Sequence, residues 1–261
     1  MDLGLRGRRA IVTGASRGIG RRVAHRLAAE GAHVLMVGRD LDALRAAAPA
    51  DGRAELLAAD VTAPDAGERI VAACVERLGG VDVLVNNAGT SRHVPLEQLA
   101  DADWERQWQL NVRAPERLMR AAAPRMARGG WGRIVNVASS SGKRPSASNV
   151  AYAVTKSAQL ALSRAYADAW AARGVLVNAV APGPTATGLW LDDGGLADQA
   201  AAARGVTRAE ALAAAAARVP LGRLCEPDEI ADVVVFLCSE RASAVAGASW
   251  SVDGGAVPSF I

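Results

Sequence analysis

The sequence has few residues of the kinds that crosslink chains or bind metals. The cysteines are Cys74, Cys225 and Cys238, and the histidines are His25, His33 and His93. The cysteines are widely spaced, so we interpret them as small buried apolar side chains in a reducing compartment rather than as disulfide partners. Cysteines and histidines together form no metal-ligand spacing, and we predict no metal site.

Long apolar runs and charge clusters are also missing. No stretch of about 18 apolar residues occurs, which argues against a membrane partner. No apolar signal core precedes the first predicted strand, so we expect a cytoplasmic location rather than export. The formal net charge is only +3 and the arginines are scattered. We therefore do not expect nucleic acid as a partner.

What the chain does have is an alternation of apolar runs and helical patterns from end to end. The predicted strands are 10–12, 33–37, 54–59, 81–85, 133–137, 175–180 and 249–252. The predicted helices are 21–30, 40–48, 62–78, 101–127 with a bend at Pro115, 152–173, 196–204, 207–218 and 227–239. This α/β pattern predicts one Rossmann-type, doubly wound parallel sheet of about seven strands with helices on both faces. No linker interrupts it, so we predict a single domain over residues 1–261.

A glycine-rich turn, Thr13–Gly20, joins the first predicted strand to the first helix. Glycines in this position let the backbone approach a diphosphate, and the first N–H groups of the helix point at it. Gly14 permits an unusual φ, Gly18 removes a side chain that would block the phosphates, and Gly20 lets the helix and strand pack closely. A turn without a ligand is the alternative reading of this motif alone.

Polar turns follow the other predicted strands. They are Gly38-Arg39, Asp60-Val61, Asn86–Gly89, Ser139–Ser141 and Pro182-Gly183. In a parallel sheet the ligand crevice lies beyond the carboxyl ends of the strands. We therefore expect all of these turns to lie at one edge of the sheet.

Tyr152 and Lys156 are four residues apart on a predicted helix and so share one face. A cation about 5 Å from the phenol, at an effective dielectric near 20, would stabilise the phenolate by roughly 3 kcal/mol, or about two pKa units. We therefore expect Lys156 to bring the pKa of Tyr152 towards the range of a general acid. An ordinary surface pair is the alternative.

Two further polar groups accompany this pair. A hydroxyl of the Ser139–Ser141 turn is suited to hydrogen-bond a carbonyl oxygen, although a simple polar turn would look the same. Asn111 lies inside a predicted helix, where asparagine is mildly unfavourable, so we expect it either to hold a water or to face solvent.

Taken together, these residues resemble the short-chain dehydrogenase/reductase family, including its 3-oxoacyl-thioester (acyl-carrier-protein) reductases. The matching pieces span nearly the whole chain in the family's order: Thr13–Gly20, Asn86-Asn87-Ala88-Gly89, Asn111, Ser139, Tyr152 with Lys156, Pro182-Gly183 and Val252-Asp253-Gly254-Gly255. Ser139 precedes Tyr152 by 152 − 139 = 13 positions, as in the family motif, which selects it over its serine neighbours.

The resemblance implies hydride transfer between a nicotinamide and a substrate carbonyl. It implies that Tyr152 donates the proton, Lys156 assists Tyr152 and binds the nicotinamide ribose, Ser139 polarises the carbonyl, and Asn111 holds a relay water. The cofactor-binding residues it implies are Gly14, Ser16, Arg17, Gly18, Ile19, Gly20, Gly38, Arg39, Asp60, Val61, Asn87, Ala88, Gly89, Tyr152, Lys156, Pro182, Gly183 and Thr185.

The cofactor preference follows from the end of the second predicted strand. An acidic residue there would bind the ribose 2′-OH of NAD. Here Gly38 occupies that place and Arg39 follows, with Arg17 in the glycine turn. Guanidinium groups suit a 2′-phosphate, so NADP(H) is the predicted cofactor. Asp40 lies one place beyond the usual acid, which leaves NAD(H) possible.

The substrate is a small carbonyl or alcohol compound whose identity the sequence leaves open. By the resemblance, residues 185–220 form a mobile substrate lid, with Gly194-Gly195 as a hinge and Trp190 over an apolar substrate; a surface helix pair is the alternative. The family also implies a homotetramer or homodimer. The leading reading is NADPH-dependent ketone reduction. The alternatives are an oxidative sugar or secondary-alcohol dehydrogenase and a cofactor-sensing regulator without catalysis.

Overall fold

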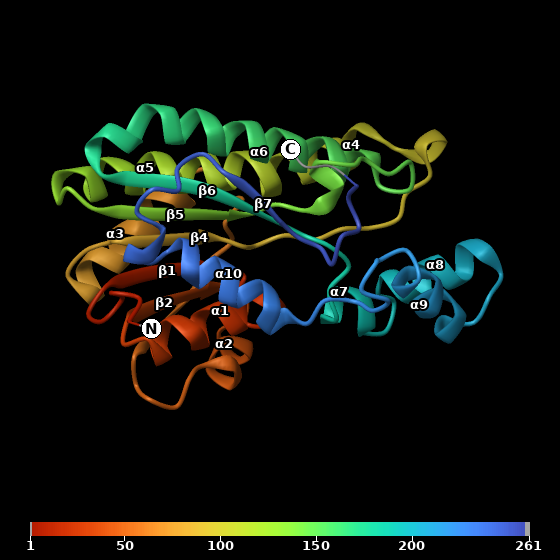
Figure 1. The fold of residues 1–261 in the computed structure, drawn as a ribbon, viewed down its shortest axis with the longest axis horizontal. Helices are drawn as coiled ribbons and strands as arrows, with labels where there is room; N and C mark the ends of the chain where they lie inside the picture. Colours follow the sequence, from red (N-terminus) through yellow and green to blue (C-terminus); the bar gives the residue numbers. More distant parts are fainter. Residues whose placement is uncertain (1, 259–261) are drawn as a thin grey trace.

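Seven parallel strands form one sheet in the order β3-β2-β1-β4-β5-β6-β7 (Figure 1). In this computed structural model, which describes residues 2–258, the strands are β1 Arg9–Thr13, β2 His33–Gly38, β3 Ala54–Ala58, β4 Val83–Asn86, β5 Gly132–Val137, β6 Val175–Pro182 and β7 Ser249–Val252. The doubly wound sheet and all seven strands are confirmed. Met1 and residues 259–261 of the predicted domain lie outside the described residues.

The sheet is buried on both faces because its strands are continuous apolar runs. Val12 of β1 packs into one core and its neighbour Ile11 into the other, as successive strand residues point to opposite faces. Helices α1 Gly18–Ala29, α2 Leu41–Ala47 and α10 Pro227–Leu237 cover the first face, and α3 Ala66–Leu78, α5 Ala114–Arg128 and α6 Val150–Trp170 cover the second (Figure 1). Helix α4 Asp101–Trp108 packs beside α6.

The long helix predicted over 101–127 is not continuous. A π-helical turn at Gln109–Arg113 separates α4 from α5, so the irregularity precedes Pro115, which lies in the first turn of α5. Proline is well tolerated there because its missing N–H is not needed in a helix's first turn. The predicted bend at Pro115 was therefore wrong in position, and the π turn itself contains Asn111.

The helix predicted from residue 62 begins only at Ala66. The Asp60 carboxylate accepts hydrogen bonds from the backbone N–H and the hydroxyl of Thr62, at 2.9 and 2.7 Å, which fixes this segment as a turn. Such side-chain to backbone bonds compete with helix formation.

Residues 185–220 form three helices, α7 Gly188–Leu191, α8 Leu196–Arg204 and α9 Arg208–Ala216, of which α8 and α9 project to one side of the sheet (Figure 1). Short 3₁₀ turns occur at Leu96–Gln98, Ser140–Gly142, Ala171–Arg173 and Glu240–Ala242. Over residues 2–258, no helix is both long and apolar enough to cross a membrane.

Candidate active site

The glycine turn leaves the amino-terminal end of α1 open to an anion. Gly14 and Gly18 have φ of 65° and 54°, in the left-handed region that favours glycine. A Cβ on Gly20 would collide with the Asn87 amide and the Gly14 carbonyl oxygen. Arg17 precedes α1 without capping it, and the first turn holds no acidic residue. The unpaired N–H groups of this turn fit a diphosphate.

The glycine turn is fastened to the turn after β4 by Thr13, a residue that the sequence analysis did not single out. The Thr13 hydroxyl accepts hydrogen bonds from the backbone N–H groups of Asn87 and Ala88, at 3.0 and 3.1 Å. The Asn87 amide donates to the carbonyl oxygens of Thr13 and Gly14, at 2.9 and 3.2 Å. A threonine that ends a buried strand was the available signal. These bonds bring two predicted cofactor segments together.

At the end of β2, Arg39 is exposed and Asp40 caps α2. The Asp40 carboxylate accepts from the N–H groups of Asp42 and Ala43, at 2.9 and 3.1 Å. On the neighbouring strand, hydrogen bonds from Thr62 and the nearby charge of Arg39 lower the pKa of Asp60. The predicted residues Gly38, Arg39 and Asp60 thus lie at one edge of the sheet, because β2 and β3 are parallel neighbours.

Arg17 lies in the glycine turn but is already engaged. Its guanidinium forms an ion pair with Asp192, with Nη1 and Oδ2 3.2 Å apart, and both side chains are largely exposed. Asp192 directly follows α7. The pair therefore joins the glycine turn to the 185–220 segment, a contact that the sequence analysis did not predict.

Ser139 follows β5 and Tyr152 lies in the first turn of α6. The Ser139 hydroxyl accepts from the Ser141 backbone N–H at 3.1 Å and lies close enough to Tyr152 to influence its pKa. Burial raises the pKa of Tyr152, and the Ser139 hydroxyl opposes that rise only in part. The expectation that Lys156 lowers this pKa was therefore wrong, because desolvation of the phenolate dominates.

Lys156 is buried beside Tyr152, with Nζ 5.7 Å from the centre of the phenol ring. Nζ donates to the carbonyl oxygen of Val137 and to Oε1 of Gln159, both at 2.9 Å. Burial lowers the pKa of Lys156 to about 7. The lysine therefore uses two of its three donors on the protein. Gln159, which is 1% exposed, is a site residue that the sequence analysis missed.

Asn111 is fully buried in the π turn, which excludes the solvent-facing alternative. Its amide nitrogen donates to Oγ1 of Thr155 at 3.0 Å and to Oε1 of Gln107 at 2.6 Å. Its Oδ1 is buried without a hydrogen-bond partner among residues 2–258. A Cβ on Gly89 would lie 3.8 Å from both this oxygen and Lys156 Nζ. Asn111, Gly89 and Lys156 thus border one space.

The last predicted segment follows β6. The Gly183 N–H donates to the Val252 carbonyl at 3.1 Å, and a Cβ on Gly183 would lie 2.8 Å from the Cα of Asp253. The Thr185 hydroxyl is buried and donates to the Gly183 carbonyl at 2.9 Å. Close backbone packing against β7 therefore explains the glycine.

The predicted turns lie at or just beyond the carboxyl ends of the strands, as expected of a doubly wound sheet. Asn111 reaches the same edge from the π turn, and Lys156 reaches it from α6. Within residues 2–258, no group of three or more histidine, cysteine, aspartate or glutamate side chains is placed to hold a metal.

Comparisons with known proteins agree with this geometry. The profile of the family described as "Enoyl-(Acyl carrier protein) reductase" matches residues 14–257. Galactitol 2-dehydrogenase of Agrobacterium fabrum is 35% identical over 94% of this chain and 96% of its own length. A 3-oxoacyl-[acyl-carrier-protein] reductase FabG of Vibrio cholerae is 35% identical over 97% of this chain and 98% of its own. The crystal structure of L-sorbose reductase from Gluconobacter frateurii, complexed with NADPH and L-sorbose, matches with a TM-score of 0.91, 34% identity and full coverage of both chains.

The fold, the site and these relatives define an NAD(P)-dependent oxidoreductase that acts on CH–OH and C=O groups. The chain belongs to the short-chain dehydrogenase/reductase family, which confirms the resemblance seen in the sequence.

Proposed function

We propose that this protein reduces a ketone to a secondary alcohol with NADPH. One observation carries the proposal: Ser139 and Tyr152 lie close together, with Lys156 beside them, at the same sheet edge as the uncapped end of α1. A proton donor and an anion-binding turn at one edge support the proposal, because hydride transfer to a carbonyl requires both.

The residues of the site have separate tasks in this reaction. The nicotinamide, when bound, supplies the hydride. Tyr152 gives its proton to the carbonyl oxygen, and its raised pKa supports this direction because the phenol is protonated at neutral pH. Ser139 holds the same oxygen in line. Lys156 has one ammonium donor left, which would bind the ribose, and its charge assists Tyr152 from nearby. The unpaired Oδ1 of Asn111 holds a water beside Lys156.

NADPH is the proposed cofactor rather than NADH. Arg39 has no ion-pair partner among residues 2–258, so its guanidinium is available to a 2′-phosphate. The Asp40 carboxylate caps the amino-terminal end of α2, so it is not free to accept a hydrogen bond from a ribose 2′-OH. The neighbouring structure with NADPH supports the same choice.

Sugar–polyol interconversion is the second candidate, in either direction. It is favoured by the relatives, which include a galactitol dehydrogenase, a sorbitol dehydrogenase and an L-sorbose reductase. For the first candidate, ketone reduction with NADPH, the proposed substrate is a 3-oxoacyl thioester, as the names of the FabG relatives suggest. Both candidate reactions would use Asn111, Ser139, Tyr152 and Lys156. The choice between them therefore depends on the residues that contact the rest of the substrate.

We further propose that residues 1–261 form one cytoplasmic domain, assembled as a homotetramer or homodimer, and that 185–220 is a substrate lid. The lid is supported by two contacts. Asp192 pairs with Arg17, and Oε1 of Gln199 in α8 accepts from the His93 N–H at 2.9 Å. The first contact reaches the glycine turn, and the second reaches the segment that follows Gly89.

The test is consumption of NADPH, followed at 340 nm, against ketoses, 3-oxoacyl thioesters and simple ketones. Tyr152→Phe should lower kcat by at least ~10²-fold, because it removes the proton donor and leaves the ring. Cofactor affinity and the melting temperature should stay near the wild-type values. Near-normal turnover by this variant would overturn the mechanism, and tight NADPH binding without turnover of any substrate would favour the regulator.

A further inference from the structure

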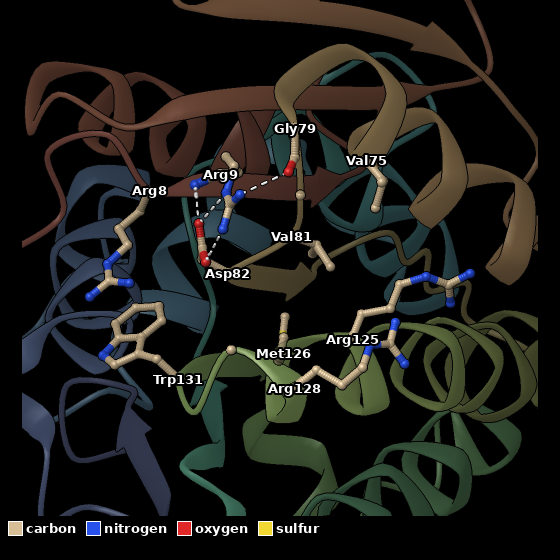
Figure 2. A pocket seen from close by; sticks show the side chains of 12 residues that line it. Arg8, Arg9, Val75, Gly79, Val81, Asp82, Arg125, Met126, Arg128 and Trp131 are labelled. Carbon is tan, nitrogen blue, oxygen red and sulfur yellow. Dashed lines mark hydrogen bonds and ion pairs between the residues drawn. The ribbon is translucent and has the colours of Figure 1, made fainter.

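A cavity of about 360 Å³ lies at the edge of the sheet opposite the candidate active site (Figure 2). Its walls come from the first residue of β1, from the turns before β4 and β5, and from the end of α5. Strands of five or six residues rise about 15–20 Å, so the cavity is a sheet's length away from Tyr152. The residues that matter are Arg8, Arg9, Asp82, Arg125, Arg128 and Trp131.

The one carboxylate in this wall is already neutralised. Asp82 accepts from Nε and Nη2 of Arg9, at 2.6 and 2.7 Å, in a two-pronged ion pair that Figure 2 shows face on. The Arg9 backbone N–H adds a third bond at 2.9 Å. Asp82 therefore has little acceptor capacity left for the other guanidinium groups of the cavity.

The cavity wall holds three further arginines and no further carboxylate, although two of these arginines pair with glutamates outside the wall. Arg8 stacks over the Trp131 ring at 3.6 Å and pairs with Glu240, and Arg125 pairs with Glu68. Neither Glu240 nor Glu68 lines the cavity.

Arg128 is exposed, and it forms no ion pair with any residue in the range 2–258. In Figure 2, Arg125 and Arg128 flank the cavity on the side opposite Trp131.

The backbone adds further donors. Gly80, Val81 and Trp131 line the cavity, lie outside helices and strands, and have N–H groups that find no acceptor in the described part of the chain. Gly79, at φ 81°, turns the chain sharply before Gly80 and Val81, and Gly130, at φ 67°, does so before Trp131. Free N–H groups beside a glycine turn favour negative charge, as guanidinium groups do.

We propose that this cavity binds a small multivalent oxyanion that carries phosphate or carboxylate groups. Guanidinium forks recognise both groups through paired, charge-assisted hydrogen bonds. The volume is at the lower end of the range for small-molecule sites, which suits a compact anion and excludes a dinucleotide. The site is independent of the reaction proposed above, since no residue is shared.

The test is calorimetric titration of the full-length protein with inorganic pyrophosphate and, separately, with citrate at constant ionic strength. Each titration is run with and without saturating NADPH, which blocks the glycine turn. Saturable binding of either anion with NADPH present is the expected result, and the two arms separate phosphate from carboxylate preference. Binding that disappears when NADPH is added would assign the anion to the glycine turn and overturn the proposal.

Variants locate the anion. The double substitution Arg125→Ala/Arg128→Ala should weaken binding at least tenfold. Arg120→Ala is the matched control, because Arg120 is on the same helix, is 65% exposed and lies outside the cavity wall. Equal affinity in the double variant and the control would overturn the proposal. Arg128→Ala alone, at an exposed position, keeps the test decisive should the double variant misfold.

Discussion

Gln159 should set the pKa of Lys156, and Gln159→Met tests this. Methionine keeps nearly the same length but removes one of the two oxygens that accept from Nζ, at 2.9 Å. Losing such an acceptor from a buried charged donor costs about 1.5–3 kcal/mol. That equals about 1–2 pKa units. The pKa of Lys156, already lowered to about 7 by burial, should therefore fall further by that amount.

The chain offers an unusually clean assay, since Lys143 and Lys156 are its two lysines. Protein labelled with ¹³C at lysine Cε gives one titrating signal for each, and Lys143→Arg assigns them. The Lys143 signal is an internal reference, because Lys143 donates to Ser249 and Ser251 and makes no contact with Gln159. Only the Lys156 signal should shift its midpoint in Gln159→Met.

Gln159→Glu should shift the pKa of Lys156 in the opposite direction. A carboxylate keeps the acceptor and adds a negative charge beside Nζ, which stabilises the ammonium, so the pKa of Lys156 should rise. A Lys156 midpoint that stays within about 0.3 units in Gln159→Met, or that moves the same way in both variants, would refute the assignment. The control is an unchanged melting temperature at a pH where Lys156 is neutral.

Three other predictions concern the same edge of the sheet. Because burial depresses the pKa of Lys156, the unfolded chain holds more protons above pH 7, so stability rises with pH there. In urea titrations between pH 7.5 and 8.5, the unfolding free energy should rise more steeply with pH in the wild type than in Lys156→Met, by up to about 1.4 kcal/mol per pH unit. Equal dependence of the unfolding free energy on pH in the two proteins would contradict this prediction. Gly20→Ala should weaken NADPH binding at least ~10-fold and lower the free energy of unfolding by about 1–3 kcal/mol, because the added Cβ would collide with the Asn87 amide. An unchanged Kd for NADPH in a fluorescence titration would count against this prediction. Asp192→Ala frees Arg17, so the KM for NADPH should fall several-fold while that for NADH stays constant, with stability changed by less than about 1 kcal/mol; equal changes for both cofactors would disprove this role.

Much of the fold was predictable because a buried parallel strand leaves a direct signature. Runs such as Val34–Val37 are apolar without alternation, and a glycine or a polar turn ends each one. The site residues follow from the same rule, since parallel strands deliver their exit turns to one edge. Helix starts were less predictable, as residue 62 shows, because a side-chain bond from Thr62 to Asp60 decides the local structure there.

Contacts between residues that are far apart in the sequence could not be predicted from the sequence. The pairing of Arg17 with Asp192 joins residues 175 positions apart, and neither residue is unusual in its local sequence. The π turn around Asn111 is similar, since a helical pattern does not reveal one extra residue per turn. The turn buries Asn111 against Thr155 of α6, and only the packing of the two helices gives the asparagine its position.

The pKa of Tyr152 shows most clearly that residue spacing alone does not predict the electrostatics of the site. The Tyr152–Lys156 spacing correctly places a phenol near an ammonium, yet the sign of the pKa shift depends on what surrounds both groups. Burial disfavours the phenolate and the ammonium alike, so it raises one pKa and lowers the other. The two pKa values thus move apart from nearly equal ordinary values, so that the lysine becomes the more acidic group. A phenol that stays protonated beside a lysine that titrates near neutrality is poised to give up a proton and to recover it. That arrangement suits reduction of a carbonyl, where the donor must hold its proton until the oxygen becomes basic.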